Sequence, residues 1–208
     1  MNIDVISEVI SHLDISKYEE FGNGLPDREQ KRILSYWKIH TKYKVMVNIY
    51  GKFWYKNDKL HRGNDLPAIV GTDGTKYWYK NGELHRDGDL PAIEWANGDK
   101  EWYKNGKPHR DGDLPAVECA GGTKEWWRNG KRHRDGDLPA IQYEDGTKYW
   151  YKNGKRHRDG DLPAVEYISG TKYWYKNGKR HRDDVLPAVI WEDGYKEWWK
   201  NGVRYYLN

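Results

Sequence analysis

The stretch WYKNGKRHRDGDLPAVEY, residues 150–167, decides the fold because most of it recurs at a fixed interval. Its central phrase HRDGDLPA stands at 85–92, 109–116, 133–140 and 157–164, with variants at 61–68 and 181–188. A histidine recurs every 24 residues from His61 to His181, and a tryptophan keeps the same period from Trp54 to Trp198. An enzyme needs one catalytic constellation, whereas six copies of one phrase indicate repeated architecture. The sequence therefore predicts a tandem array whose units bury their apolar faces against one another.

The composition predicts a core built from aromatic rings. Leu, Ile, Val and Phe number only 36 of 208 residues, a proportion typical of disordered chains. The 12 tryptophans and 17 tyrosines reverse that reading, because each large aromatic side chain buries about 150–250 Å². We expect the repeat core to contain one tryptophan and one histidine per unit: Trp54, Trp78, Trp102, Trp126, Trp150, Trp174, Trp198, His61, His85, His109, His133, His157 and His181.

Charge and cysteine content limit the class of protein. The net charge of +4 is small beside 36 basic and 32 acidic side chains, so the surface is mixed and lacks the single-signed field of a dedicated nucleic-acid binder. One cysteine, Cys119, excludes an intramolecular disulfide framework, and we interpret it as a small core residue. The sequence lacks the features of a signal peptide or a membrane span. These features predict a soluble, intracellular protein.

Two turn signals divide each unit into hairpins. Asp145-Gly146 and Asn153-Gly154 are preferred pairs for two-residue type I′ turns. The first turn would place Ile141 opposite Trp150, and the second would place Trp150 opposite His157 and Tyr151 opposite Arg156.

Alternation then assigns one buried and one exposed face. The expected buried face holds Ile141, Tyr143, Trp150 and His157; the exposed face holds Ala140, Gln142, Tyr149, Tyr151, Arg156 and Arg158. In the crossover Asp-Gly-Asp-Leu-Pro, we expect Leu162 to fold back under the sheet. The predicted fold class is mainly β, an elongated twisted antiparallel sheet of repeated hairpins over residues 46–208, with six full units and a truncated seventh.

The repeated phrase supports a family resemblance. A glycine turn followed by T-K-x-W-Y-K-N-G resembles variant MORN repeats, and W-Y-K-N-G-K-x-H-R-D-G-D-L-P-A resembles repeat proteins of large DNA viruses of amoebae. The resemblance covers residues 50–204 and departs from the common MORN pattern in the HRDGDLPA insert. It implies a structural or interaction array, since related MORN repeats are associated with membranes and protein partners. It also implies a location in the host cytoplasm or the virion.

Residues 1–45 have a different pattern and predict a helical cap. Ile3, Ile6, Val9, Ile10 and Leu13 recur at helical spacing, and Ser16 with Glu19 fits a capping box. The phrase DVISEVISHLDISKYEEF resembles the start of an F-box, which implies a ubiquitin-ligase adaptor as partner. The alternative is a cap that only shields the first sheet edge.

Each catalytic or metal-binding motif has a structural alternative that we favour. HRD matches part of the kinase catalytic loop, but no glycine-rich loop or DFG accompanies it. Asp159 and Asp161 lack the further ligands of a calcium loop, so we expect them to bond local backbone amides. Histidines of neighbouring units would lie roughly 10–14 Å apart, two or three strand spacings, too far to share a zinc ion. We therefore predict no enzyme activity, no cofactor and no metal.

Basic side chains beside the exposed tyrosines suggest a binding surface. The candidate residues are Arg132, Arg134, Tyr151, Arg156, Arg158, Tyr175, Arg180 and Arg182. Arginine on tyrosine is often ordinary surface packing, but such a face also suits an acidic partner. Our first hypothesis is a non-enzymatic scaffold that binds a protein, with residues 128–182 as the contact zone. The alternative is a module for an anionic polymer, a nucleic acid or membrane headgroups.

Overall fold

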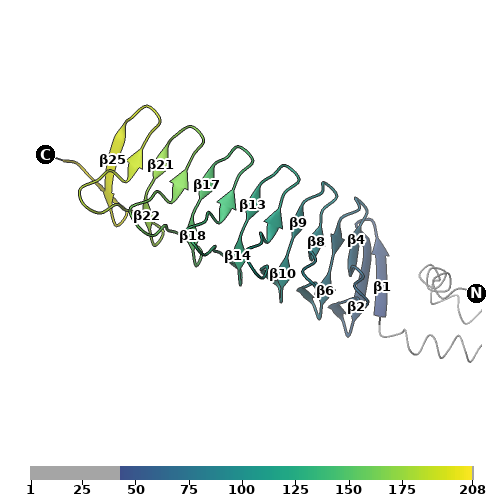
Figure 1. Ribbon diagram of the computed structural model, residues 1–208. Helices are drawn as coiled ribbons and strands as arrows, with labels where there is room; N and C mark the ends of the chain where they lie inside the picture. Colours follow the sequence, from purple (N-terminus) through teal and green to yellow (C-terminus); the bar gives the residue numbers. More distant parts are fainter. Residues whose placement is uncertain (1–42, 208) are drawn as a thin grey trace, which may run out of the picture.

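The chain forms an extended array of β-hairpins, and the computed structural model describes residues 43–207 (Figure 1). No helix occurs in that range, and a long antiparallel sheet runs through it, which confirms the mainly β prediction. The first strand, β1, begins at Tyr43, just ahead of the predicted boundary at residue 46. The predicted helical cap and its F-box-like phrase lie outside the described residues, apart from the last three positions. Within the described range no helix is long and apolar enough to cross a membrane.

Two strands from each unit build the long sheet. It opens with β1 (Tyr43–Asn48) and β2 (Gly51–Lys56), with β3 (Lys59–Leu60) paired to β2. The first strand of each later unit is β4 (Ile69–Gly71), β8 (Ile93–Glu94), β12 (Val117–Glu118), β16 (Ile141–Gln142), β20 (Val165–Glu166) or β24 (Val189–Ile190). The second is β5 (Lys76–Tyr77), β9 (Lys100–Glu101), β13 (Lys124–Glu125), β17 (Lys148–Tyr149), β21 (Lys172–Tyr173) or the longer β25 (Lys196–Lys200). Neighbours pair in chain order, so the array grows by adding one unit after another.

The rest of each unit is a small hairpin, which we call the tip. Its first strand is β6 (Tyr79–Lys80), β10 (Tyr103–Lys104), β14 (Trp127–Arg128), β18 (Tyr151–Lys152) or β22 (Tyr175–Lys176). Its second is β7 (Glu83–Leu84), β11 (Lys107–Pro108), β15 (Lys131–Arg132), β19 (Lys155–Arg156) or β23 (Lys179–Arg180), and β26 (Val203–Tyr205) pairs with β25. Figure 1 places these tips along one side of the array, away from the connections between sheet strands.

The predicted turn in the tip is confirmed. Asn153 and Gly154 have φ of 52° and 82°, as a type I′ turn requires. Tyr151 pairs with Arg156, and the His157 N–H donates to the Trp150 carbonyl at 3.1 Å. The tip register is therefore the one expected from the sequence.

The turn in the long sheet was predicted in the wrong register. Ile141 pairs with Tyr149 and not with Trp150. The Gly146 N–H donates to the Tyr143 carbonyl at 3.0 Å, and only Gly146 of the Asp-Gly pair has a positive φ, 90°. This is a three-residue loop with glycine in the left-handed position. A slip of one residue exchanges the faces of a strand, so the predicted faces change as well.

The core differs from the prediction at several positions, since among the predicted histidines only His181 is buried and the others are partly exposed. Trp150 is 5% exposed and Ile141 2% exposed, as predicted, but Ala140 is fully buried and Tyr143 is 41% exposed. Leu162 is 44% exposed, so it does not fold back under the sheet. Most units bury the tryptophan, the alanine after proline and the following Ile or Val, whereas Trp54, Trp198, Ile69 and Val117 are partly exposed. The alanines without any exposed surface are Ala68, Ala92, Ala116, Ala140, Ala164 and Ala188.

Candidate interaction surface

The histidines of the repeated phrase connect each unit to the next. Nδ1 of His133 accepts a hydrogen bond from the Asn153 N–H at 3.2 Å, and Nε2 lies 2.9 Å from an Asp135 carboxylate oxygen. An Nδ1 that accepts requires the ring proton on Nε2, which then donates to the aspartate. In every unit the backbone N–H of the asparagine in the following turn donates to a histidine Nδ1. These histidines are His61, His85, His109, His133, His157 and His181. The histidines thus hold the positions of the tips.

The arginine after each histidine connects the unit to the one before. The Arg158 guanidinium lies 3.9 Å from the centre of the Trp150 ring. Its Nε and one Nη donate to the Asp137 carboxylate at 2.7 and 2.9 Å, and the other Nη donates to the Pro163 carbonyl at 3.3 Å. The hydrogen bond from Arg158 lowers the pKa of Asp137 below its usual value. Such a bidentate contact fixes orientation as well as distance.

These contacts account for the motifs that resemble catalytic or metal sites. The two aspartates of each Asp-Gly-Asp were expected to bond local backbone amides, and this was wrong. Asp159 accepts from Lys152 and His157, and Asp161 accepts from Arg182 of the next unit at 2.6 Å. Among residues 43–207 no group of three or more His, Cys, Asp or Glu side chains could hold a metal ion.

The arginine–aspartate contact was missed from the sequence, although a signal for it exists. The two residues stand 21 positions apart, on neighbouring units. Where the aspartate position holds Val185, the arginine position 21 residues later holds Tyr206. The two positions change together, as contact partners would.

The structure divides the predicted arginine and tyrosine face into two groups. Arg134, Arg158 and Arg182 belong to the contacts between units, stacked on Trp126, Trp150 and Trp174. The remaining members lie together along the tips: Arg132, Tyr151, Arg156, Tyr175 and Arg180.

The tip arginines lie against aromatic rings of their own and neighbouring units. Arg156 is 5.4 Å from the Tyr149 ring centre and 5.3 Å from that of Tyr175. It also donates to the Tyr151 hydroxyl at 3.2 Å. Arg132 donates to the Glu125 carboxylate at 3.1 Å. Much of the charge that we predicted to face a partner is therefore engaged within the chain.

A continuous row of aromatic rings crosses the long sheet in the C-terminal half. Tyr143, Tyr149, Tyr167, Tyr173 and Trp191 meet edge to face, with successive ring centres 5.5, 6.0, 5.8 and 5.6 Å apart. We call these five residues the aromatic row. Its outer rings are 36–41% exposed, while burial raises the pKa of Tyr149 and Tyr173. The sequence reading missed this row because it assigned Tyr143 to the core.

The aromatic row stops at the middle of the array. The equivalent positions there are Glu101, Cys119 and Glu125. Cys119 is half-buried, and burial raises the pKa of its thiol. A protonated, partly covered thiol is a poor nucleophile, in keeping with the structural role expected for it.

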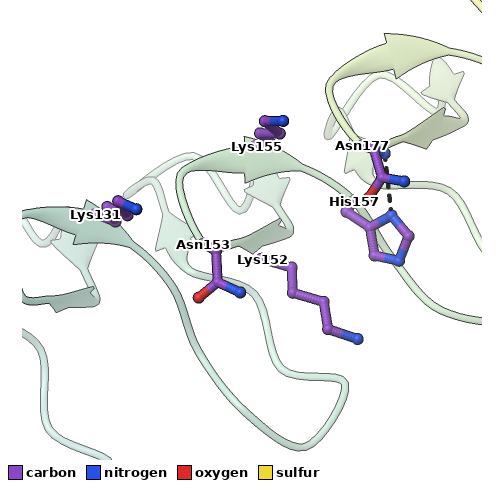
Figure 2. Close-up of a pocket in the computed structure, with 6 residues that line it drawn as sticks. All are labelled: Lys131, Lys152, Asn153, Lys155, His157 and Asn177. Atoms are coloured by element: carbon purple, nitrogen blue, oxygen red, sulfur yellow. Dashed lines mark hydrogen bonds between the residues drawn. The ribbon is translucent and has the colours of Figure 1, made fainter.

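A pocket lies along three successive tips, and Figure 2 shows its lining. Its volume is about 550 Å³, and it is lined by Lys131, Lys152, Asn153, Lys155, His157 and Asn177. The Lys152 ammonium lies 2.9 Å from the Asp159 carboxylate. Within the described part of the chain Lys131 and Lys155 form no salt bridge. The pocket therefore carries positive charge, with no carboxylate among its lining residues.

No protein-family model, curated protein or solved structure matches this chain. The hairpin array is loosely compatible with a MORN-like repeat, but no family match supports that assignment.

Proposed function

We propose that this protein is a non-enzymatic scaffold that binds an extended protein partner along its long sheet. The observation that carries the proposal is the aromatic row. Tyrosine and tryptophan are enriched at protein interfaces, where they act as anchors. Contiguous exposed apolar patches on soluble proteins often mark such sites. The polar groups of the repeated phrase are already bonded between units, which supports a binding role over a catalytic one.

The exposed surface around the row supports this choice. Ile168, on the loop that follows Tyr167, is 71% exposed, and Trp191 is 36% exposed. A partner with apolar anchors fits this surface. The row also overlaps the contact zone of residues 128–182 predicted from the sequence.

The test is affinity capture with matched variants of the immobilised full chain. Tyr167→Ser combined with Ile168→Ser removes the centre of the aromatic row. Trp95→Ser removes an equivalent exposed ring in the N-terminal half, 37% exposed and 5.7 Å from Tyr77. We expect a protein partner that survives high salt to be lost from the first variant and kept by the second. Equal capture by both folded variants would contradict the proposal.

A second candidate function, binding of an anionic polymer, is favoured by the pocket between the tips. Its three lysines and absence of lining carboxylates suit an anion. Such a partner would be released at moderate salt, because affinity that comes from counterion release falls steeply with salt.

A further inference from the structure

Lysine side chains form an ordered row along the tips. A Cβ atom placed on Gly178 would lie 3.6 Å from Cβ of Lys155, so the Lys155 stem runs beside the turn of the next unit. The same contact relates Lys107 to Gly130, Lys131 to Gly154 and Lys179 to Gly202. We call Lys107, Lys131, Lys155 and Lys179 the lysine row. All four are exposed, and none forms a salt bridge within residues 43–207.

The lysine row borders a pocket that has three lysines and no carboxylate among its lining residues. In Figure 2 Lys131 and Lys155 lie on successive tips, with Lys152 below Lys155 and His157 beside Asn177. The Asn153 and Asn177 amides can donate hydrogen bonds. The Nδ1 of His157 is already occupied by the Asn177 N–H at 3.1 Å. The cations available to a ligand are therefore the two row lysines, with Lys152 shared with Asp159.

Between tips closer to the C-terminus the same set of residues recurs at the equivalent positions. Towards the N-terminus it does not. One unit later the equivalent positions hold Lys155, Lys176, Asn177, Lys179, His181 and Asn201. Two units earlier the position of Lys131 holds Glu83, which replaces a row lysine by a carboxylate. The stem of Glu83 lies beside Gly106 as the lysine stems do, so the exchange changes charge and leaves the packing alone.

Phosphate suits the chemistry of these spaces. Lysine binds phosphate as a point charge, without the bidentate geometry that favours arginine for carboxylate and phosphate alike. The nearby arginines, Arg132 and Arg156, already contact aromatic rings or Glu125. The rings nearest the tips, Tyr151 and Tyr175, lie against arginine, which leaves no free platform on which unpaired bases could stack.

We propose that the lysine row binds the phosphate backbone of duplex nucleic acid, with one contact at each of four tips. This rests on the second candidate function and specifies its ligand. Two sheet strands per unit give a spacing of roughly 10 Å between row lysines. A duplex carries one charge per about 1.7 Å of its axis with both strands counted, so a row across four tips meets phosphates of both strands in any register. Recognition is therefore independent of base sequence.

The experiment titrates a labelled duplex DNA of 20 base pairs with the full chain from 50 to 200 mM salt. Four phosphate contacts predict a slope of log K against log salt of about −3.6. Lys131→Gln combined with Lys155→Gln keeps the stems and removes two charges, so the slope should become shallower by about 2. Lys59 has the same contact with Gly82 but is separated from the row by Glu83; Lys59→Gln is therefore the control and should leave binding unchanged. Circular dichroism confirms that each variant is folded.

Each other outcome overturns a defined part of the proposal. Absence of duplex binding at 50 mM salt rules out nucleic acid as the ligand. Unchanged binding by the double variant rules out the lysine row as the site. Tighter binding of a single strand rules out the duplex. If a polyglutamate peptide binds as well as the duplex and is lost in the double variant, the phosphate assignment is wrong while the anionic-polymer function stands.

Discussion

The N-terminal half of the array, residues 54–125, and the C-terminal half, residues 126–198, share their interior and differ on their surface. Trp78 and Trp150 are 6% and 5% exposed, and Arg86 stacks on Trp78 at 3.8 Å much as Arg158 stacks on Trp150. The tips and the row positions differ: leucine, proline and glutamate in the first half give way to arginine, lysine and tyrosine in the second. What both halves keep is what folding requires. The second half alone carries the tip arginines and the aromatic row, whereas the lysine row already begins at Lys107 in the first half.

The largest expected effect tests the shared interior. Trp78→Ala and Trp150→Ala each remove a buried indole, the surface on which an arginine stacks, and an Nε1 donor to a backbone carbonyl. Each should lower the free energy of unfolding by about 3–5 kcal/mol, measured by urea denaturation. If one variant loses much more unfolding free energy than the other, the two halves do not have equivalent cores.

Removal of a connecting arginine should have the next largest effect. Arg86→Met and Arg158→Met each leave an aspartate of the preceding unit without its bidentate partner. Charged hydrogen bonds contribute about 1.5–3 kcal/mol, and each variant should lose about 2 kcal/mol. The same urea titrations measure this loss of unfolding free energy. Arg156→Met at the tip is the control, and its effect should be smaller. A larger loss at the tip would reverse the ranking of the two arginine groups.

Acid should weaken both halves together. Hydrogen bonds from Arg86 and Arg158 lower the pKa of Asp65 and Asp137 in the folded chain. A lowered folded pKa means that the stabilisation is complete above the unfolded value of about 3.9 and is lost as pH falls through the folded value. The melting temperature should therefore drop below about pH 4. In the Asp137→Asn variant the melting temperature should fall less at acid pH than in the parent chain. An equal fall would mean that the Arg158–Asp137 pair does not contribute to the acid sensitivity.

A smaller effect is expected at the last crossover. Val185 has a φ of 60°, where a β-branched residue is strained, and its equivalents Asp65, Asp89 and Asp137 adopt similar values. Val185→Asn should raise stability by about 1 kcal/mol, because asparagine tolerates the left-handed region. Differential scanning calorimetry measures the change. A lower melting temperature would show that the Val185 side chain, 64% exposed, contributes more than its backbone strain costs.

The smallest effect on stability is expected where the halves differ most. Replacing Arg132, Arg156 and Arg180, which are partly exposed, by leucine should change stability by less than about 1 kcal/mol per site, since cation–π contacts near the surface contribute about 0.5–1 kcal/mol. Leu60 and Leu84 already occupy this position in earlier units. Binding of an acidic partner should weaken, with a shallower salt dependence. A large loss of stability would mean that the second half needs its arginines to fold.

The tip could be predicted from sequence because its signal is local. Every unit after the first places Asn-Gly at the turn, and both residues adopt the positive φ that a type I′ turn needs. The sheet turn was misread because Asp145-Gly146 looks like the same signal. The position of Asp145 also holds Ser169, which tolerates positive φ poorly, and this indicates that glycine alone is left-handed there.

The contacts between units could not be read in the same way. His133 bonds a backbone N–H 20 residues later, and Arg158 bonds a carboxylate 21 residues earlier. Neither partner lies on the same hairpin, so strand alternation carries no information about them. Their positions depend on how far one unit is displaced from the next. The aromatic row was missed for a related reason, since it crosses strands of several units and its faces depend on the sheet register.

The arginine–aspartate contact has a direction, and this has a consequence for how such a chain can change length. Each unit offers a carboxylate on one side and a guanidinium on the other, so the joint is heterologous, the kind that propagates without closing. A block of 24 residues copied in frame brings both halves of the joint with it. Its new neighbours then already carry the matching groups. Unequal recombination within the coding sequence could therefore lengthen or shorten the array by whole blocks without redesigning a single interface.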